Sequence, residues 1–227
     1  MKVNADKIKK KTDEFWNDKK VVDIFADQPV SEYWIDFFKL HKETSSDKRV
    51  LDLGCGGGRN LKMLLDLGYD VFACDLHKKM VDITREEYAK YVPGKDSKKK
   101  VVLCSMIKLP YEDNFFDIIL SHGVYHNAVS EGEFIKALRE SARVLKKDGY
   151  LCFNIFGSAS IGKDLREAGS NLYLTKEGLL MVLLSSKNFL KETQKIGLIL
   201  EKPIIEYVSQ VSTGRRAVMR GILRKIS

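Results

Sequence analysis

The chain has 227 residues, of which 44% are hydrophobic and 31% are charged, a globular balance that excludes a fibrous or disordered protein. The length suits one domain with a substantial core. The formal net charge is +8 at pH 7, but the lysines are spread along the chain, and the densest runs, 7–11 and 95–100, are typical of a solvated tail and loop. Charge alone therefore does not indicate a nucleic-acid partner.

The first 48 residues form an aromatic-rich segment ahead of the first predicted strand. Tyr33, Trp34, Phe37 and Phe38 recur at helical spacing, which predicts an amphipathic helix. Its aromatic face either packs against the body of the domain or closes over the active site as a lid.

From residue 49 to 155, short apolar runs alternate with helical patterns, which predicts βα units around a parallel sheet. The expected strands are 50–53, 71–74, 101–104, 116–121 and 150–155. Gly68 and Gly149 follow helical runs, where we expect left-handed residues that end those helices. The fold class is therefore α/β, a Rossmann-like doubly wound sheet that is mostly parallel.

After residue 155 this alternation stops. Glycines, serines and charges over 157–175 predict a long loop above a site. A helix is expected over 186–196, followed by an antiparallel hairpin of strands 198–211 and 215–226. We expect one domain over 1–227, divided into a helical lid segment (1–48), a cofactor-binding core (49–155) and a substrate-side loop, helix and C-terminal hairpin (156–227).

The chain shows no apolar run near the ~20 residues that cross a bilayer, and its lysine-rich start does not resemble a signal peptide. We therefore expect a cytoplasmic protein without membrane contact. The cysteines form neither a Cys-x-x-Cys pair nor a Cys/His cluster, so no metal and no disulfide framework is indicated. They are Cys55, Cys74, Cys104 and Cys152.

A glycine-rich run, residues 54–58, sits where the first strand turns toward a helix. Missing side chains there let a ligand approach outward-facing backbone amides. Asp75 ends the second strand roughly 20 residues later, where a carboxylate can accept hydrogen bonds from both hydroxyls of a ribose. The pair favours an adenosine ligand. A dinucleotide site would have a third glycine at the position of Arg59, so a nicotinamide oxidoreductase is disfavoured.

Residues 50–58, Val-Leu-Asp-Leu-Gly-Cys-Gly-Gly-Gly, resemble motif I of the class I S-adenosylmethionine-dependent methyltransferases, hDhGxGxG. Further motifs follow in the order of that family, namely Asp75, 108–111, 115–117 and 142–149. The resemblance covers 49–155. Within the superfamily, segments 58–60 and 67–71 are similar to the tellurite-resistance and thiopurine-type methyltransferases, which act on small molecules.

The resemblance implies S-adenosylmethionine as the cofactor. Asp52 would hold the glycine loop or the methionine ammonium, Gly54 and Gly56 would line the methionine and ribose, and Asp75 would receive the ribose hydroxyls. The full set of cofactor-binding residues expected is Asp52, Gly54, Cys55, Gly56, Asp75, Leu76, Ser105, Met106, Ile107 and His122.

The adenine contacts depart from the family pattern in one respect. Leu76 and Ile107 would flank the adenine, but many relatives carry an acid after the third strand where this chain has Ser105 before Met106. The Ser105 hydroxyl either accepts the hydrogen bond of the adenine amino group or bonds locally at the strand end.

Residues that follow the fourth strand should face the reactive methyl group, because ligands bind at the carboxyl ends of parallel strands. The sulfonium is already activated, so the protein mainly has to align the acceptor and exclude water. His126 is the expected general base for a hydroxyl or ammonium acceptor, and Tyr125 would orient the acceptor or contact the sulfonium. His122 is expected at the cofactor. Alternatively, His126 and Asn127 cap the next helix.

Three functions remain open from the sequence. The first is methyl transfer to an oxygen, nitrogen or sulfur atom of a small molecule, favoured because no RNA-binding module is visible. The second is a tRNA or rRNA methyltransferase, for which the lysine runs would contact phosphates. The third is a non-catalytic protein that binds S-adenosylmethionine. The acceptor and the oligomeric state are not encoded in any motif.

Overall fold

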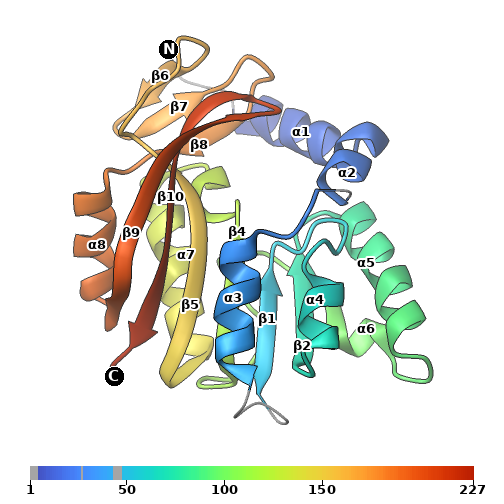
Figure 1. Ribbon diagram of the computed structural model, residues 1–227. Coiled ribbons are helices and arrows are strands. Elements are labelled where there is room, and N and C mark those ends of the chain that lie inside the picture. Colours follow the sequence, from blue (N-terminus) through green and yellow to red (C-terminus); the bar gives the residue numbers. More distant parts are fainter. Residues whose placement is uncertain (1–4, 27, 43–47) are drawn as a thin grey trace.

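A central sheet organises the computed structural model, which describes residues 5–26, 28–42 and 48–227 (Figure 1). In this part of the chain the strand order is β3-β2-β1-β4-β5-β10-β9. Strands β1 to β5 pair in parallel, and β10 pairs antiparallel with both β5 and β9. Their bounds are β1 Arg49–Leu53, β2 Asp70–Asp75, β3 Val101–Leu103, β4 Phe116–His122, β5 Leu145–Gly157, β9 Leu198–Val211 and β10 Gly214–Lys225. The expected doubly wound sheet with an antiparallel hairpin is confirmed.

Helices cover both faces of this sheet, which explains why β1 reads as a nearly continuous apolar run. Leu51 and Leu53 point into a core cluster shared with α7 and α8, whereas Val50 points into a second cluster shared with α3, α4 and α5. The alternation follows from the two-residue period of a strand. The helices are α3 Glu32–Leu40, α4 Leu61–Asp66, α5 Lys78–Tyr91, α6 Ser97–Lys100, α7 Glu131–Val144 and α8 Ser186–Gln194.

The N-terminal segment divides into two parts with different positions. On α3, Trp34, Phe37 and Phe38 are buried against the sheet, and each such aromatic contributes about 2–3 kcal/mol by burial. Helices α1 (Ala5–Trp16) and α2 (Lys19–Ala26) lie instead above the carboxyl ends of the strands (Figure 1). The packing alternative therefore holds for α3, while α1 and α2 have the position expected of a cover.

The expected long loop over 157–175 is wrong in part. Three short strands, β6 (Arg166–Gly169), β7 (Leu172–Leu174) and β8 (Leu180–Val182), form a small antiparallel sheet. Asn171, at φ 54°, makes the turn between β6 and β7. Strands of three or four residues are too short to show an alternating pattern. The small sheet lies at the same end of the molecule as the tip of the β9–β10 hairpin (Figure 1).

Of the two glycines expected to end helices in a left-handed conformation, Gly68 behaves as expected, with φ of 83°. At the second site the left-handed residue is Asp148, at φ 62°, rather than Gly149. A Cβ on Gly149 would lie 2.8 Å from the Asp117 carbonyl oxygen, so close backbone approach explains this glycine.

Candidate active site

The loop between β1 and α4 is shaped by glycines in left-handed conformation. Gly54, Gly56 and Gly58 have φ of 70°, 54° and 86°. A Cβ on Gly54 would lie 2.2 Å from Val124 Cγ2, so only glycine fits there. A Cβ on Gly56 would meet no atom within 4 Å, because Gly56 faces the open cavity. The loop thus leaves space for a ligand against its backbone.

Asp75, at the end of β2, ties this loop to the sheet. Its Oδ2 accepts from the Gly56 amide at 3.0 Å and its Oδ1 accepts from the His77 amide at 2.9 Å. Burial raises the pKa of Asp75, and the His77 and Gly56 amides oppose that rise. Each oxygen keeps a lone pair for another donor, and Asp75 lines the cavity, so the carboxylate can still receive ribose hydroxyls.

Asp52 carries an unsatisfied acceptor beside the loop. Its side chain is 1% exposed, Oδ1 accepts from Asn60 Nδ2 at 3.1 Å, and Oδ2 has no hydrogen-bond partner among the described residues. Burial raises the pKa of Asp52 to about 6, against the lowering effects of Asn60 and Arg59. Asp52, unlike Asp75, is not one of the residues that line the cavity. A buried carboxylate oxygen that lacks a donor would still fit a cationic ligand group, such as an ammonium, that reached it.

Of the residues expected to contact the adenine, some line the cavity and others do not. Leu76, Ser105 and Met106 line the cavity, whereas Ile107 packs against the core. Ser105 Oγ has a long local contact, 3.5 Å from the Ile107 amide. Cys55 is 4% exposed with its sulfur 3.6 Å from Thr84 Oγ1, so it supports the loop from beneath.

A cavity of about 1260 Å³ extends from the glycine loop beneath the small sheet and the hairpin tip. Ligand sites are typically about 300–1,000 Å³, so this cavity has room for a nucleoside-type cofactor and a second molecule. Its far wall, which we name the acceptor half, is largely apolar. That wall includes Val129, Phe156, Leu172, Leu180, Met181 and Val211.

Both expected histidines line the cavity, and each has one ring nitrogen engaged. His122 Nδ1 accepts from Trp34 Nε1 at 3.1 Å, and His126 Nδ1 accepts from the Phe156 amide at 3.2 Å. Burial lowers the pKa of both, that of His126 to about 3. A neutral imidazole whose lone pair is already used does not suit the general-base role expected for His126.

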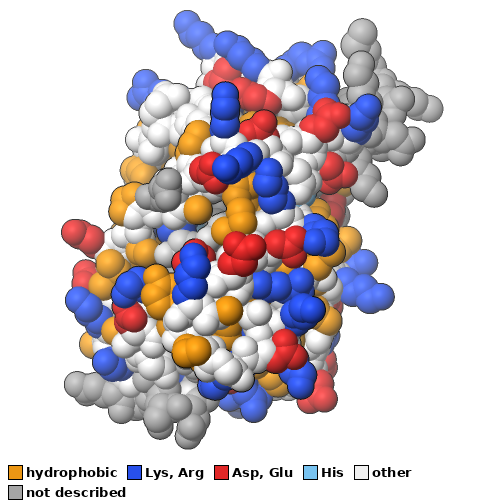
Figure 2. Space-filling view, turned by 90° about the vertical axis from the view of Figure 1, so that its right-hand side faces the viewer, with side chains coloured by type: hydrophobic (Ala, Val, Ile, Leu, Met, Phe, Trp, Pro, Cys, Tyr) orange, Lys and Arg blue, Asp and Glu red, His pale blue; other side chains and the backbone are white. Residues whose placement is uncertain are grey.

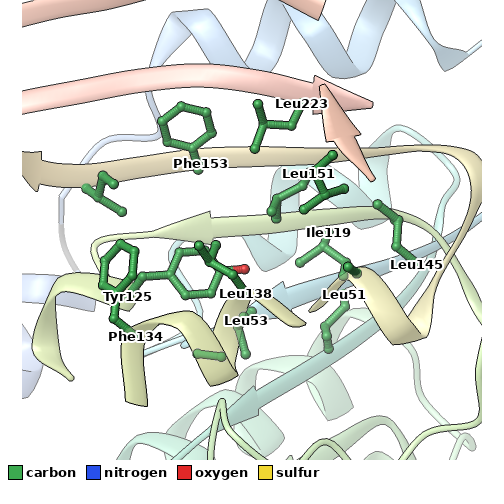
Figure 3. Close-up of a cluster of buried hydrophobic side chains, with 14 of the residues drawn as sticks. Leu51, Leu53, Ile119, Tyr125, Phe134, Leu138, Leu145, Leu151, Phe153 and Leu223 are labelled. Carbon is green, nitrogen blue, oxygen red and sulfur yellow. The ribbon is translucent and has the colours of Figure 1, made fainter. Parts of the chain in front are cut away.

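Tyr125 does not reach the cavity. Its ring is fully buried beside Phe134 and Leu138 (Figure 3), and its hydroxyl lies 2.6 Å from Ser141 Oγ. The expected contact with the acceptor or the sulfonium is therefore not retained. The alternative of a helix cap is also not found, because Ser130, rather than His126 or Asn127, caps α7 by accepting from the Glu133 amide.

Several cavity residues were not anticipated from the sequence. Asp13 and Trp16 of α1 border the cavity, and the Trp16 ring stacks on that of His77 at 6.2 Å. Next to the cavity lining, at the hairpin tip, Arg216 is 1% exposed and pairs with Asp164 at 2.7 Å. The helical spacing of residues in α1 could have indicated that this helix has a cavity-facing side. The Arg216–Asp164 ion pair joins residues about fifty positions apart, so no local sequence pattern indicates it.

Comparison with known proteins agrees with this geometry. Residues 51–153 match the family described as "Methyltransferase domain". The structure of a Burkholderia thailandensis 1,6-didemethyltoxoflavin-N1-methyltransferase with bound S-adenosylhomocysteine shares the fold, with a TM-score of 0.68, 17% identity and coverage of 96% of this chain and 87% of that one. Residues 51–153 of the chain therefore form a methyltransferase domain, and S-adenosylmethionine is its cofactor. The resemblance seen in motif I is confirmed.

Two relatives in sequence carry different acceptors in their names. The Bos taurus protein named "Probable tRNA methyltransferase 9B" is 29% identical over 126 residues, 56% of this chain and 25% of that protein. A ubiquinone biosynthesis O-methyltransferase from Pelagibacter ubique is 30% identical over 161 residues, 66% of this chain and 62% of that protein. The chain thus spans about a quarter of the first relative and under two thirds of the second.

Among the described residues, no helix combines the length and apolarity needed to span a membrane.

Proposed function

We propose that this protein is a methyltransferase that moves the methyl group of S-adenosylmethionine to a small molecule enclosed in the acceptor half. The observation that carries the proposal is the continuity of one cavity from Gly56 and Asp75 to the apolar wall beneath β6–β8. An acceptor held there would meet the methyl group with water excluded, which is what an in-line transfer requires. The three segments of the chain would act as one domain.

The chain's own residues take the following roles in this proposal. Asp75 receives the ribose hydroxyls, Asp52 faces the methionine ammonium, and Leu76 and Met106 lie along the adenine. His122 contacts the cofactor from the end of β4. When bound, S-adenosylmethionine supplies an activated methyl group, so the protein contributes alignment and exclusion of water.

Surface charge and enclosure favour a small acceptor over RNA. On the face in Figure 2, Lys and Arg side chains are interspersed with Asp and Glu rather than gathered into one basic area. The similarity to the tRNA methyltransferase 9B relative spans only 25% of that protein, so it leaves the acceptor of this chain open. An RNA methyltransferase and a non-catalytic binding protein remain the alternative outcomes of the test.

The test uses S-adenosylmethionine labelled in its methyl group, offered with either a protein-free small-molecule extract or total tRNA. We expect label to appear in the small-molecule fraction and not in tRNA, and RNA retention to be weak and to fall steeply with salt. Label in tRNA would overturn the small-molecule assignment. Binding of S-adenosylhomocysteine without label in either fraction would favour the non-catalytic alternative.

A further inference from the structure

The two cavity histidines are fixed in the same protonation pattern by unrelated donors. Phe156 donates its backbone amide to His126 Nδ1, and Trp34 donates its indole N–H to His122 Nδ1. Because a nitrogen that accepts a hydrogen bond carries no proton, each neutral ring must carry its proton on Nε2. The structure therefore presents Nε2–H groups, rather than free lone pairs, on these two rings.

The surroundings of His126 hold it in this state. Its ring stacks on Phe156, with centroids 4.0 Å apart, and burial together with the nearby Arg216 charge lowers its pKa to about 3. Other charged or titratable groups around it are His122 on β4 and Asp164, the partner of Arg216. Glu133 also lines the cavity, but its recorded partner is the Val129 amide, and among the described residues no carboxylate is hydrogen-bonded to His126 Nε2. The ring therefore stays a neutral donor across the physiological range.

The polar group that Nε2–H would meet must come from the ligand. Within the described part of the chain, Nε2 has no recorded protein partner, although His126 is 2% exposed and lines the cavity. Apolar members of the cavity wall include Phe156, Met181 and Val218, and polar members include Asn154 and Thr213. A buried donor without a protein partner favours a ligand that places one acceptor atom against it.

We propose that His126 donates a hydrogen bond through Nε2–H to the methyl acceptor, and that this acceptor is a mostly apolar conjugated molecule with a carbonyl oxygen or ring nitrogen conjugated to the methylated atom. The inference rests on the proposed function. It names the class of substrate: acidic enols, phenols that carry a conjugated carbonyl, or ring amides, each of which loses its proton to water before transfer.

The electron balance needs no base from the protein. The acceptor anion forms a bond to the methyl carbon, the bond from sulfur to that carbon breaks, and its electron pair stays on sulfur. A hydrogen bond to the conjugated carbonyl stabilises the anion in which the acceptor reacts, so His126 would raise the fraction of anion bound.

The first experiment measures the tautomer directly by nitrogen NMR on protein with ¹⁵N-labelled histidine, using His126→Gln to assign the signal. We expect Nε2 to be protonated and Nδ1 unprotonated from about pH 5 to 8. An imidazolium or an Nδ1–H form at about pH 6.5 would overturn the inference, whether or not methyl transfer is observed.

The second experiment measures acceptor binding by calorimetry on protein saturated with S-adenosylhomocysteine. The probe is 4-hydroxycoumarin, an acidic enol conjugated to a carbonyl, and the control probe is 1-naphthol, which lacks the carbonyl. His126→Leu should weaken 4-hydroxycoumarin binding about tenfold, while His126→Gln, which keeps an N–H donor, should weaken it less than about threefold. Neither variant should change 1-naphthol binding.

Two results would contradict the proposed donor. One is equal affinity of wild type, His126→Leu and His126→Gln for 4-hydroxycoumarin, and the other is wild-type affinity no higher than for 1-naphthol. Absence of S-adenosylhomocysteine binding would instead overturn the proposed function, and the NMR measurement would still decide the tautomer.

Discussion

The two halves of the cavity differ in how they are built. The cofactor half consists of turns at the carboxyl ends of β1, β2 and β3, where glycines and carboxylates contact each other through backbone amides. The acceptor half consists of apolar side chains from β6–β8, Phe156, and a mixture of polar and apolar side chains from the hairpin tip. The first is specified by neighbours in sequence, and the second by elements far apart.

This difference separates what a superfamily shares from what one member does. Residues 51–153 match the methyltransferase-domain family and include the glycine loop, Asp75 and both histidines after β4. The small sheet and the hairpin tip lie outside that match. Acceptor choice is therefore expected to depend on segments that the family motifs do not describe.

The largest effect is expected at Gly56, where a substitution can abolish cofactor binding without unfolding the protein. Gly56→Ala places a methyl group in the ligand space, so affinity for S-adenosylhomocysteine should fall at least about 100-fold, or about 2.7 kcal/mol, by calorimetry. Gly68→Ala is the matched control, because Gly68 also has a left-handed φ and no atom within 4 Å of an added Cβ. Both should lose about 1–2 kcal/mol of stability, and only Gly56→Ala should lose affinity.

If Gly68→Ala reduced the affinity as strongly as Gly56→Ala, the loss would reflect backbone strain, and the placement of the cofactor at Gly56 would be wrong.

The next effect concerns Asp52 and pH. The folded-state pKa of about 6 lies above the ordinary 3.8, so the protonated form is favoured in the folded protein. The contribution of protonated Asp52 to the free energy of unfolding is fully present below about pH 4 and is lost as pH rises through about 6. At about pH 7.5, Asp52→Asn should be more stable than wild type by up to about 3 kcal/mol in urea unfolding, and the difference should shrink at about pH 4.5.

Binding of S-adenosylhomocysteine tests the protonation of Asp52 in a second way. An ammonium next to Asp52 favours the carboxylate, so binding at about pH 5.5 should release protons and make the calorimetric enthalpy depend on the buffer. If the stability difference between wild type and Asp52→Asn did not vary with pH, and binding released no protons, Asp52 would not contact the ammonium.

The smallest effect is expected at the Arg216–Asp164 ion pair, which fixes the hairpin tip next to the acceptor half. Asp164→Asn leaves the buried Arg216 guanidinium without its counter-charge and should cost about 2 kcal/mol, less than for a fully buried pair because the Asp164 side chain is 19% exposed. Asp148→Asn, in the exposed pair with Arg224, should have a much smaller effect, because solvent screens that pair and Arg224 also pairs with Glu201. Urea unfolding measures both.

Cofactor affinity should be unchanged in Asp164→Asn, because the ion pair lies at the hairpin tip and not at the glycine loop. A large loss of S-adenosylhomocysteine binding would show that the two halves are energetically coupled and would contradict their separation.

The sheet order and most strands could be predicted because each is encoded locally. The run 50–53 and the glycines after it carry β1 and its turn within nine residues, and the turn at 212–214 predicts the hairpin. The strands β6–β8 escaped prediction because they are three or four residues long and include Glu167, Gly169 and other residues that are not β-forming.

The residues of the candidate site could be predicted only where their positions depend on neighbouring residues in the sequence. The positions of Gly56 and Asp75 followed from the strand-to-turn pattern. The protonation state of His126 could not be predicted in this way. It depends on the amide of Phe156, thirty residues later, which donates to the ring nitrogen that a general base would need. The core position of Tyr125 likewise depends on α7.

A crystal structure of the protein with S-adenosylhomocysteine would test the proposed site most directly. We expect the ribose hydroxyls within hydrogen-bond distance of the Asp75 carboxylate, the methionine ammonium near Asp52 Oδ2, and the sulfur directed toward the acceptor half where His126 lies. A ligand bound elsewhere, or a sulfur atom directed away from the apolar wall, would contradict it.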